Sequence, residues 1–219
     1  MKINTDGVLL GALAEVDEPK DILDIGTGTG VIALILAQRF PLAKIDAVEI
    51  DRTAAQTAGR NFENSPCAER LNIFPSDFKG FLTENSDRKY DLIVSNPPFH
   101  LNSLQSPKAK IALAKHAGEN FFEGLIEEIA MHLTKAGLCW LILPLQVADL
   151  VKELASINNL FLKKVITLYS FENSVAHREI LCFSLKQYKL ESSKFVIYES
   201  VGNYSAGYKQ LLQPYFIAF

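Results

Sequence analysis

Four consecutive residues have the types and spacing to carry chemistry: Asn96-Pro97-Pro98-Phe99 directly follows the apolar residues 90–95. Neither proline has an N–H to donate, so a strand over 90–95 must end at this corner. The Asn96 side-chain oxygen and the Pro97 carbonyl are acceptors, held rigidly because proline fixes φ. Phe99 adds an aromatic face on which a planar base can stack. This segment, the NPPF corner, suits a planar amine whose two N–H groups the acceptors can bind.

A planar amine on a base or a carboxamide is a poor nucleophile because its lone pair is delocalised. Two acceptors on its N–H groups localise that lone pair, which can then attack a methyl group in line. Alignment supplies most of the rate of such a transfer, and the sequence shows no obvious general base beside the corner. We therefore predict that Asn96, Pro97, Pro98 and Phe99 are catalytic, with the target base extruded into their pocket.

A glycine-rich segment, DIGTGTG (24–30), indicates where a cofactor binds. Glycines let the backbone turn tightly and approach a ligand closely. Their spacing is G-x-G-x-G, whereas dinucleotide enzymes carry G-x-G-x-x-G. Asp24, just before the first glycine, suits a cationic methionine amine and would repel a pyrophosphate. These features favour S-adenosylmethionine (SAM) over a nicotinamide cofactor.

Acids after two later strands extend the predicted cofactor site. Glu49 ends the second predicted strand, 21 residues after Gly28, where a carboxylate can accept both ribose hydroxyls. Asp77 and Phe78 follow the third predicted strand, where this kind of fold places an acid near the adenine amine. The predicted cofactor-binding residues from these motifs are Asp24, Gly26, Thr27, Gly28, Gly30, Glu49, Ile50, Asp77, Phe78 and Asn96.

Short apolar runs alternate with longer amphipathic segments, which predicts an α/β fold: a mostly parallel, Rossmann-like sheet with helices on both faces. Residues 170–178 are too few for a helical crossover, so the last two strands should form an antiparallel hairpin at one edge of a seven-stranded sheet. A single domain is expected over 1–219, with residues 194–219 packed on it. The predicted strands are 22–26, 44–50, 71–76, 90–95, 137–143, 162–169 and 179–185, and the predicted helices are 30–39, 52–64, 119–135 and 146–157.

The composition is that of an ordinary globular protein, with 48% hydrophobic and 21% charged residues in a chain of 219. The net charge of −3 argues against a dedicated nucleic-acid coat, although residues 101–219 carry 12 basic and 10 acidic residues. No apolar run reaches the roughly 18 residues of a membrane span, and the N-terminus does not read as a signal peptide. Three widely spaced cysteines and no Cys/His cluster argue against a metal site. We expect a cytoplasmic protein without a metal.

Several segments together resemble the bacterial tRNA1(Val) (adenine(37)-N6)-methyltransferase family, over nearly the whole chain. The T-D-G of MKINTDGVLLGA (1–12) and the H-R of AHREIL (176–181) are less common elsewhere and carry the resemblance. DIGTGTG, IDAVEID, YDLIVSNPPF and the tail NYSAGYKQLLQPYFIAF follow in the family's order. The resemblance implies a class I methyltransferase sheet, SAM as cofactor, and N6-methylation of adenine 37, 3′ to the anticodon of tRNA1(Val).

The resemblance also implies roles for residues outside these motifs. Thr5, Asp6 and Leu9 would lie along the methionine end of SAM, although residues 5–14 also fit a plain helix packed on the sheet. Family members usually have a basic and aromatic segment before Met1, which we expect to be absent here, and we favour a monomer. The loop 100–118 would face tRNA, with lysines in place of the family's frequent arginines. The implied RNA-binding residues are Lys108, Lys110, Lys115 and Arg178.

Other interpretations stay open from the sequence. The segment NPPFH, with His100, also resembles rRNA guanine-N2 methyltransferases, and the glutamine N5-methyltransferases of release factors carry N-P-P-Y. Both rivals tend to carry an extra recognition domain, and we expect none within residues 1–219. A SAM-binding module without catalysis is disfavoured because Asp24, Glu49 and Asn96 are all present, and a dehydrogenase is disfavoured by the glycine spacing.

Overall fold

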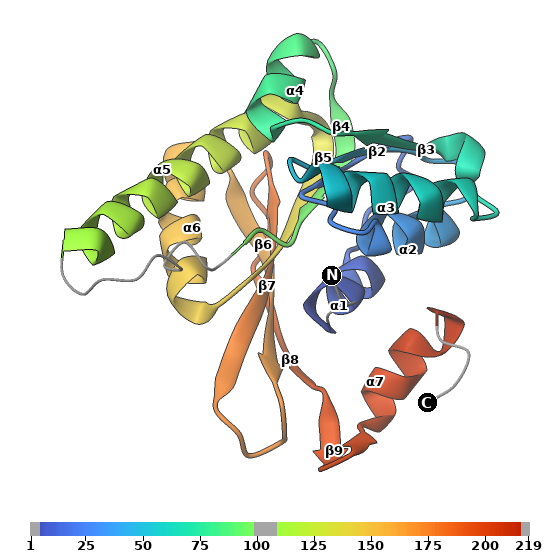
Figure 1. Ribbon diagram of the computed structural model, residues 1–219. Coiled ribbons are helices and arrows are strands. Elements are labelled where there is room, and N and C mark those ends of the chain that lie inside the picture. The colour runs from blue at the N-terminus through green and yellow to red at the C-terminus, as the bar shows by residue number, and fades with distance from the viewer. Residues whose placement is uncertain (1–4, 99–108, 216–219) are drawn as a thin grey trace.

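The computed structural model describes residues 5–98 and 109–215, which form one mixed sheet with helices on both faces (Figure 1). The sheet has eight strands in the order β3-β2-β1-β4-β5-β7-β6-β8. Strands β1 to β5 pair in parallel, and β7 is antiparallel to both β5 and β6. The predicted α/β class and the antiparallel hairpin are therefore confirmed. The strands are β1 Asp21–Ile25, β2 Lys44–Val48, β3 Leu71–Phe74, β4 Tyr90–Ser95, β5 Leu133–Leu143, β6 Phe161–Tyr169, β7 Ala176–Ser184 and β8 Glu191–Val196.

The predicted number of seven strands is wrong, because β8 adds an eighth strand beyond the hairpin and parallel to β6. The first four residues of β8 are exposed, so backbone pairing holds this strand without the alternating apolar pattern that would reveal it in a sequence. After β8 come the short pair β9 Tyr198–Ser200 and β10 Asn203–Tyr204, then helix α7 Ala206–Leu212. Tyr208 and Leu212 of α7 are buried in the same apolar cluster as Leu9 of α1.

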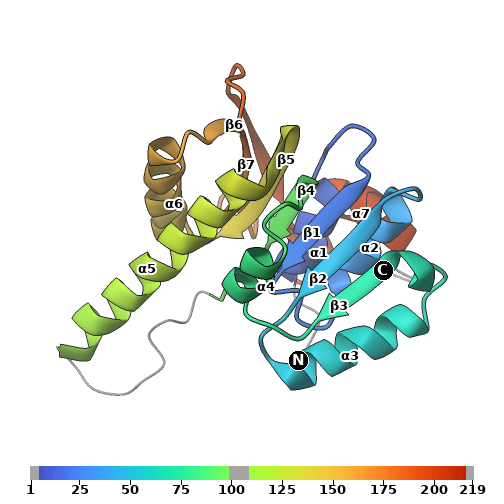
Figure 2. The ribbon, with the colours of Figure 1, turned by 90° about the horizontal axis from the view of Figure 1, so that it is seen from above.

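Two apolar layers, one on each face of the sheet, hold the helices (Figure 2). Helices α1 Thr5–Leu13, α2 Val31–Arg39, α3 Arg52–Glu63 and α7 contribute to one layer. Helices α4 Phe78–Glu84, α5 Ala109–His132 and α6 Leu145–Ile157 contribute to the other. Right-handed crossovers between parallel strands explain why α2 and α3 share a face while α4 to α6 share the opposite one.

Three helix assignments differ from the prediction: α4 and α7 were not predicted, and α5 has other bounds. Helix α4 was missed, although Phe78, Phe81 and Leu82 are buried at helical spacing. Helix α5 begins ten residues before the predicted 119 and ends at His132, because Leu133 already belongs to β5. Leu133 continues the helical spacing and also begins an apolar strand, so periodicity alone does not decide its place.

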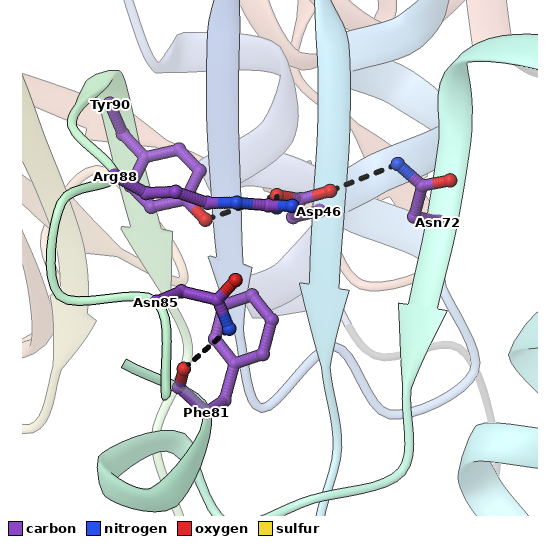
Figure 3. A network of polar contacts seen from close by, with 6 residues as sticks. All are labelled: Asp46, Asn72, Phe81, Asn85, Arg88 and Tyr90. Atoms are coloured by element: carbon purple, nitrogen blue, oxygen red, sulfur yellow. Dashed lines mark hydrogen bonds and ion pairs between the residues drawn. The ribbon is translucent and has the colours of Figure 1, made fainter. Parts of the chain in front are cut away.

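A buried carboxylate, Asp46 in the middle of β2, links three strands (Figure 3). It accepts hydrogen bonds from Asn72 of β3 at 3.0 Å and from the Tyr90 hydroxyl of β4 at 3.0 Å. Arg88 completes the network with an ion pair at 2.5 Å, and burial next to this carboxylate raises the pKa of Tyr90. Because Arg88 comes just before β4 and Tyr90 begins it, this network joins the three strands away from the carboxyl edge of the sheet.

Within residues 5–98 and 109–215, no helix combines the length and the hydropathy needed to cross a bilayer. The same residues bring no three His, Cys, Asp or Glu side chains into a group that could hold a metal ion.

Candidate functional site

A cavity of about 660 Å³ opens where the carboxyl ends of β1, β2 and β4 meet. Open α/β sheets bind their ligands at this edge, so the strand order itself gathers residues that are far apart in the sequence. The lining comes from the loop after β1 and the start of α2, the segments at the ends of β2, β3 and β4, the start of α1, and single residues of α5 and β7. The predicted site residues that line it are Asp6, Gly26, Thr27, Gly28, Glu49, Ile50, Asp77, Phe78, Asn96, Pro97, Pro98 and Arg178.

The glycine loop requires glycine at two positions for different reasons. Gly26 turns the chain out of β1 with φ +72°, a left-handed conformation that side chains rarely adopt. Gly30 also has a positive φ of +88°, and a Cβ there would meet the Phe62 ring at 2.4 Å. The loop is further fixed by Val48, whose carbonyl accepts bonds from the Gly26 and Thr27 N–H groups at 2.8 and 3.1 Å.

Asp24 lies beneath the glycine loop and is fully buried. Its Oδ2 accepts a hydrogen bond from the Thr27 hydroxyl at 2.6 Å, whereas its Oδ1 has no partner among the described residues. Burial raises the pKa of Asp24 to about 7, and the charge of Glu49 acts in the same direction. Asp24 is not part of the cavity lining, so its contact with a methionine amine stays a prediction.

Glu49 joins the end of β2 to the glycine loop. Its Oε2 accepts a hydrogen bond from the Gly28 N–H at 2.8 Å, and its Oε1 accepts one from the Asp51 N–H at 2.9 Å. A carboxylate has about four acceptor positions, so both oxygens keep room for further donors such as ribose hydroxyls. The carboxylate is mostly buried, whereas Ile50 next to it is exposed at the rim. The geometry is compatible with the predicted ribose contact.

Two aromatic side chains, Phe78 and Phe121, line the cavity beyond the end of β3 and form its aromatic wall. Asp77 caps α4 by accepting a hydrogen bond from the Gly80 N–H at 3.2 Å. Phe78 is buried and meets Phe121 of α5 edge to face, with ring centroids 5.7 Å apart. Phe121 also lines the cavity and was not predicted, because its place in the helical pattern of α5 marks it as a packing residue.

Residues 96–98 of the NPPF corner directly follow β4 at its carboxyl end. Ser95 fixes the corner to β1, because its hydroxyl donates to the Ile25 carbonyl at 2.8 Å. The Oδ1 atom of Asn96 is buried and has no hydrogen-bond partner among the described residues. A buried acceptor without a donor costs about 1–3 kcal/mol, so such an atom in a cavity wall calls for an explanation. A donor on a bound molecule would remove that cost.

An ion pair closes the cavity where α1 meets β7. Nε of Arg178 donates to Oδ2 of Asp6 at 3.0 Å, and Nη1 of Arg178 donates to the His177 carbonyl at 2.9 Å. Burial and the Arg178 charge lower the pKa of His177. Arg178 was predicted to contact RNA, and it lies in the same wall as the predicted cofactor residues.

Three more predicted residues, Thr5, Leu9 and Gly30, lie outside the cavity lining. Thr5 begins α1 and bonds to Tyr208, and burial raises the pKa of that tyrosine to about 12. Leu9 is fully buried in the apolar layer, and Gly30 is the residue that directly precedes α2. Phe99 and Lys108 lie outside the described residues, as do the side chains of Lys110 and Lys115.

Comparison with known sequences gives close relatives over the full length. Residues 5–143 match the family model of the methyltransferase small domain. A tRNA1(Val) (adenine(37)-N6)-methyltransferase from Pedobacter heparinus is 45% identical over 219 residues, which is 100% of this chain and 92% of that protein. A protein of the same name from Bacteroides thetaiotaomicron is 37% identical over 218 residues, covering 99% of this chain and 91% of that protein.

Solved structures share the fold. A predicted O-methyltransferase from Agrobacterium tumefaciens superposes with a TM-score of 0.71 at 16% identity, covering 95% of both chains. A methyltransferase from Pyrococcus furiosus superposes with a TM-score of 0.60 at 24% identity, covering 82% of this chain and 81% of the other. At these identities the likeness shows the fold alone.

Proposed function

Because the chain belongs to the tRNA1(Val) (adenine(37)-N6)-methyltransferase family, we propose that it methylates N6 of adenine 37, 3′ to the anticodon of tRNA1(Val). It is a methyltransferase with the matching domain and fold. SAM would supply the methyl group, carried on a positively charged sulfur. A tRNA substrate also implies that the enzyme acts in the cytoplasm.

The observation that best supports this proposal is the buried, unpaired Oδ1 of Asn96 at the carboxyl end of β4. In the proposed reaction this oxygen and the Pro97 carbonyl each accept one N–H of the adenine amine. The amine lone pair would then be directed toward the methyl group, and the ring would stack on Phe99. As the new N–C bond forms, the bond from the methyl carbon to sulfur would break, S-adenosylhomocysteine would leave, and one amine proton would pass to water. Since alignment carries the reaction, no strong base is needed at the corner.

The cavity residues fit a nucleoside with an amino-acid tail. Glu49 would accept the ribose hydroxyls of SAM, and Asp77 would lie near its adenine; both residues line the cavity together with Phe78. The glycine loop lets the backbone approach the ligand between these residues and the corner. The NPPF corner then closes the methyl-bearing end of the cavity.

The test is methyl transfer to purified tRNA from a strain that lacks this modification, with labelled SAM and nucleoside analysis of the product. We expect N6-methyladenosine in tRNA1(Val), and none in a transcript with guanosine at position 37. Label in N2-methylguanosine would favour the guanine alternative, and label only in protein would favour the glutamine alternative. Either result would overturn the adenine assignment.

A further inference from the structure

The ion pair between Asp6 and Arg178 is unusual because both partners line the ligand cavity. The two side chains are about 20% and 28% exposed, so the pair is largely withdrawn from water. It joins the first turn of α1 to β7, which are 172 residues apart in the chain. Because desolvation offsets much of the attraction in a partly buried ion pair, a stability role alone does not account for this pair in a cavity wall.

The strand order fixes where this pair stands relative to the rest of the site. Along the carboxyl edge, β2 with Glu49 comes first, then β1 with its glycine loop, β4 with Asn96, β5, and β7 with Arg178. A ligand with its ribose at Glu49 that extends past the glycine loop therefore points its far end toward the Asp6–Arg178 pair. In SAM the far end is a free amino acid.

The charges in the cavity wall match that end. Among the described lining residues the carboxylates are Asp6, Glu49 and Asp77, and Arg178 is the single cation. Both oxygens of Glu49 already accept backbone N–H groups, and Asp77 caps α4. Asp6 is thus the carboxylate that faces the cavity beside a cation.

A zwitterion fits this pair better than an anion does. The ammonium and carboxylate groups of an amino acid are joined through one carbon, so they can lie beside Asp6 and Arg178 with opposite charges facing. A phosphate that reached Arg178 would instead meet the negative charge of Asp6. The pair is therefore better suited to the cofactor tail than to the RNA backbone.

We propose that the Asp6–Arg178 ion pair binds the amino-acid end of the cofactor, with the Arg178 guanidinium on its carboxylate and the Asp6 carboxylate on its ammonium. The inference rests on the proposed SAM dependence and deepens it. It assigns Arg178 to the cofactor rather than to tRNA, and it gives the ammonium to Asp6 in the cavity wall rather than to Asp24 beneath the loop.

Calorimetric binding of three nucleosides separates the two charges. S-adenosylhomocysteine has both groups, decarboxylated SAM keeps only the ammonium, and 5′-methylthioadenosine has neither. Arg178→Gln should raise the Kd of S-adenosylhomocysteine at least tenfold and leave that of decarboxylated SAM unchanged or lower. Asp6→Asn should weaken both, and neither variant should change the affinity for methylthioadenosine more than twofold.

A matched control is the ion pair of Lys164 with Glu15, at 2.8 Å, which also ties the α1 region to the sheet but lies outside the cavity lining. Lys164→Gln should leave all three affinities unchanged, and Arg178→Lys should restore part of the S-adenosylhomocysteine affinity. If Arg178→Gln lowered the affinity for all three nucleosides equally, Arg178 would only position α1, and the proposal would be overturned. Unchanged affinity for S-adenosylhomocysteine in this variant would also overturn it. Wild-type protein that binds S-adenosylhomocysteine but methylates another group would overturn the adenine assignment alone.

Discussion

At the residue scale, Asn96 carries an acceptor without a donor in the cavity wall. Asn96→Ala removes that acceptor, so kcat should fall roughly 100- to 1,000-fold, as when one positioned hydrogen-bonding group is lost from an active site. The Kd of SAM should change little, because the lost bond goes to the substrate amine. Asn96→Asp keeps an acceptor oxygen and should retain more activity than Asn96→Ala. A collapse of SAM binding in the alanine variant would contradict this role.

Asp24 gives a residue-scale prediction about pH. Its pKa is about 7 in the folded chain against 3.8 for an unperturbed carboxyl, so folding favours the protonated form. The stability that it contributes is fully present below about pH 4 and is lost as the pH rises to about 7, at up to about 1.4 kcal/mol per pH unit. Asp24→Asn cannot ionise. The free energy of unfolding of this variant relative to wild type should therefore rise between about pH 4 and pH 7 and stay constant at higher pH.

Denaturant unfolding of the ligand-free protein at pH 4, 5.5, 7 and 8 measures this difference. Asp17→Asn, which removes an exposed carboxylate, is the control and should show no such widening gap. A constant difference between Asp24→Asn and wild type at all four pH values would show that folding leaves the pKa of Asp24 unchanged. The same variant also tests whether a charged Asp24 is needed for SAM binding.

At the element scale, the turn from the glycine loop into α2 should tolerate no side chain at Gly30. An alanine there must adopt a positive φ and place its Cβ 2.4 Å from the Phe62 ring, so we expect a loss of about 2–4 kcal/mol. Gly207 in α7 is the matched control, because its Cβ would meet nothing within 4 Å. Gly207→Ala should raise the free energy of unfolding by up to about 1 kcal/mol. Thermal unfolding of both variants checks the opposite signs.

Elements with continuous apolar runs were predictable from the sequence. An exposed strand held by backbone pairing and a short helix behind its cap were not. The strands β1, β2, β4 and β5 are buried on both faces and show in the sequence as apolar runs. The exposed β8 offers no such run, and α4 has only seven residues, about two turns, after its Asp77 cap. In the site, the motifs gave most of the cavity lining. The Asp6–Arg178 contact was missed because it depends on the distant β7 returning next to β5.

At the scale of the whole molecule, a chain of net charge −3 must still hold the phosphates of a tRNA. We expect alanine at three lysines after the corner, one just before α5 and two in its first two turns, to raise KM for tRNA and to leave the Kd of SAM unchanged. The salt dependence of tRNA binding should fall by about 0.7–0.9 per lost contact. Those lysines are Lys108, Lys110 and Lys115.

The control removes equal charge at the opposite edge of the sheet, where β6 starts and where the chain passes from β7 to β8. Its substitutions are at Lys163, Lys186 and Lys189. Equal effects of the two triple variants on KM would mean that general charge, rather than a tRNA-facing loop beside the catalytic corner, holds the substrate.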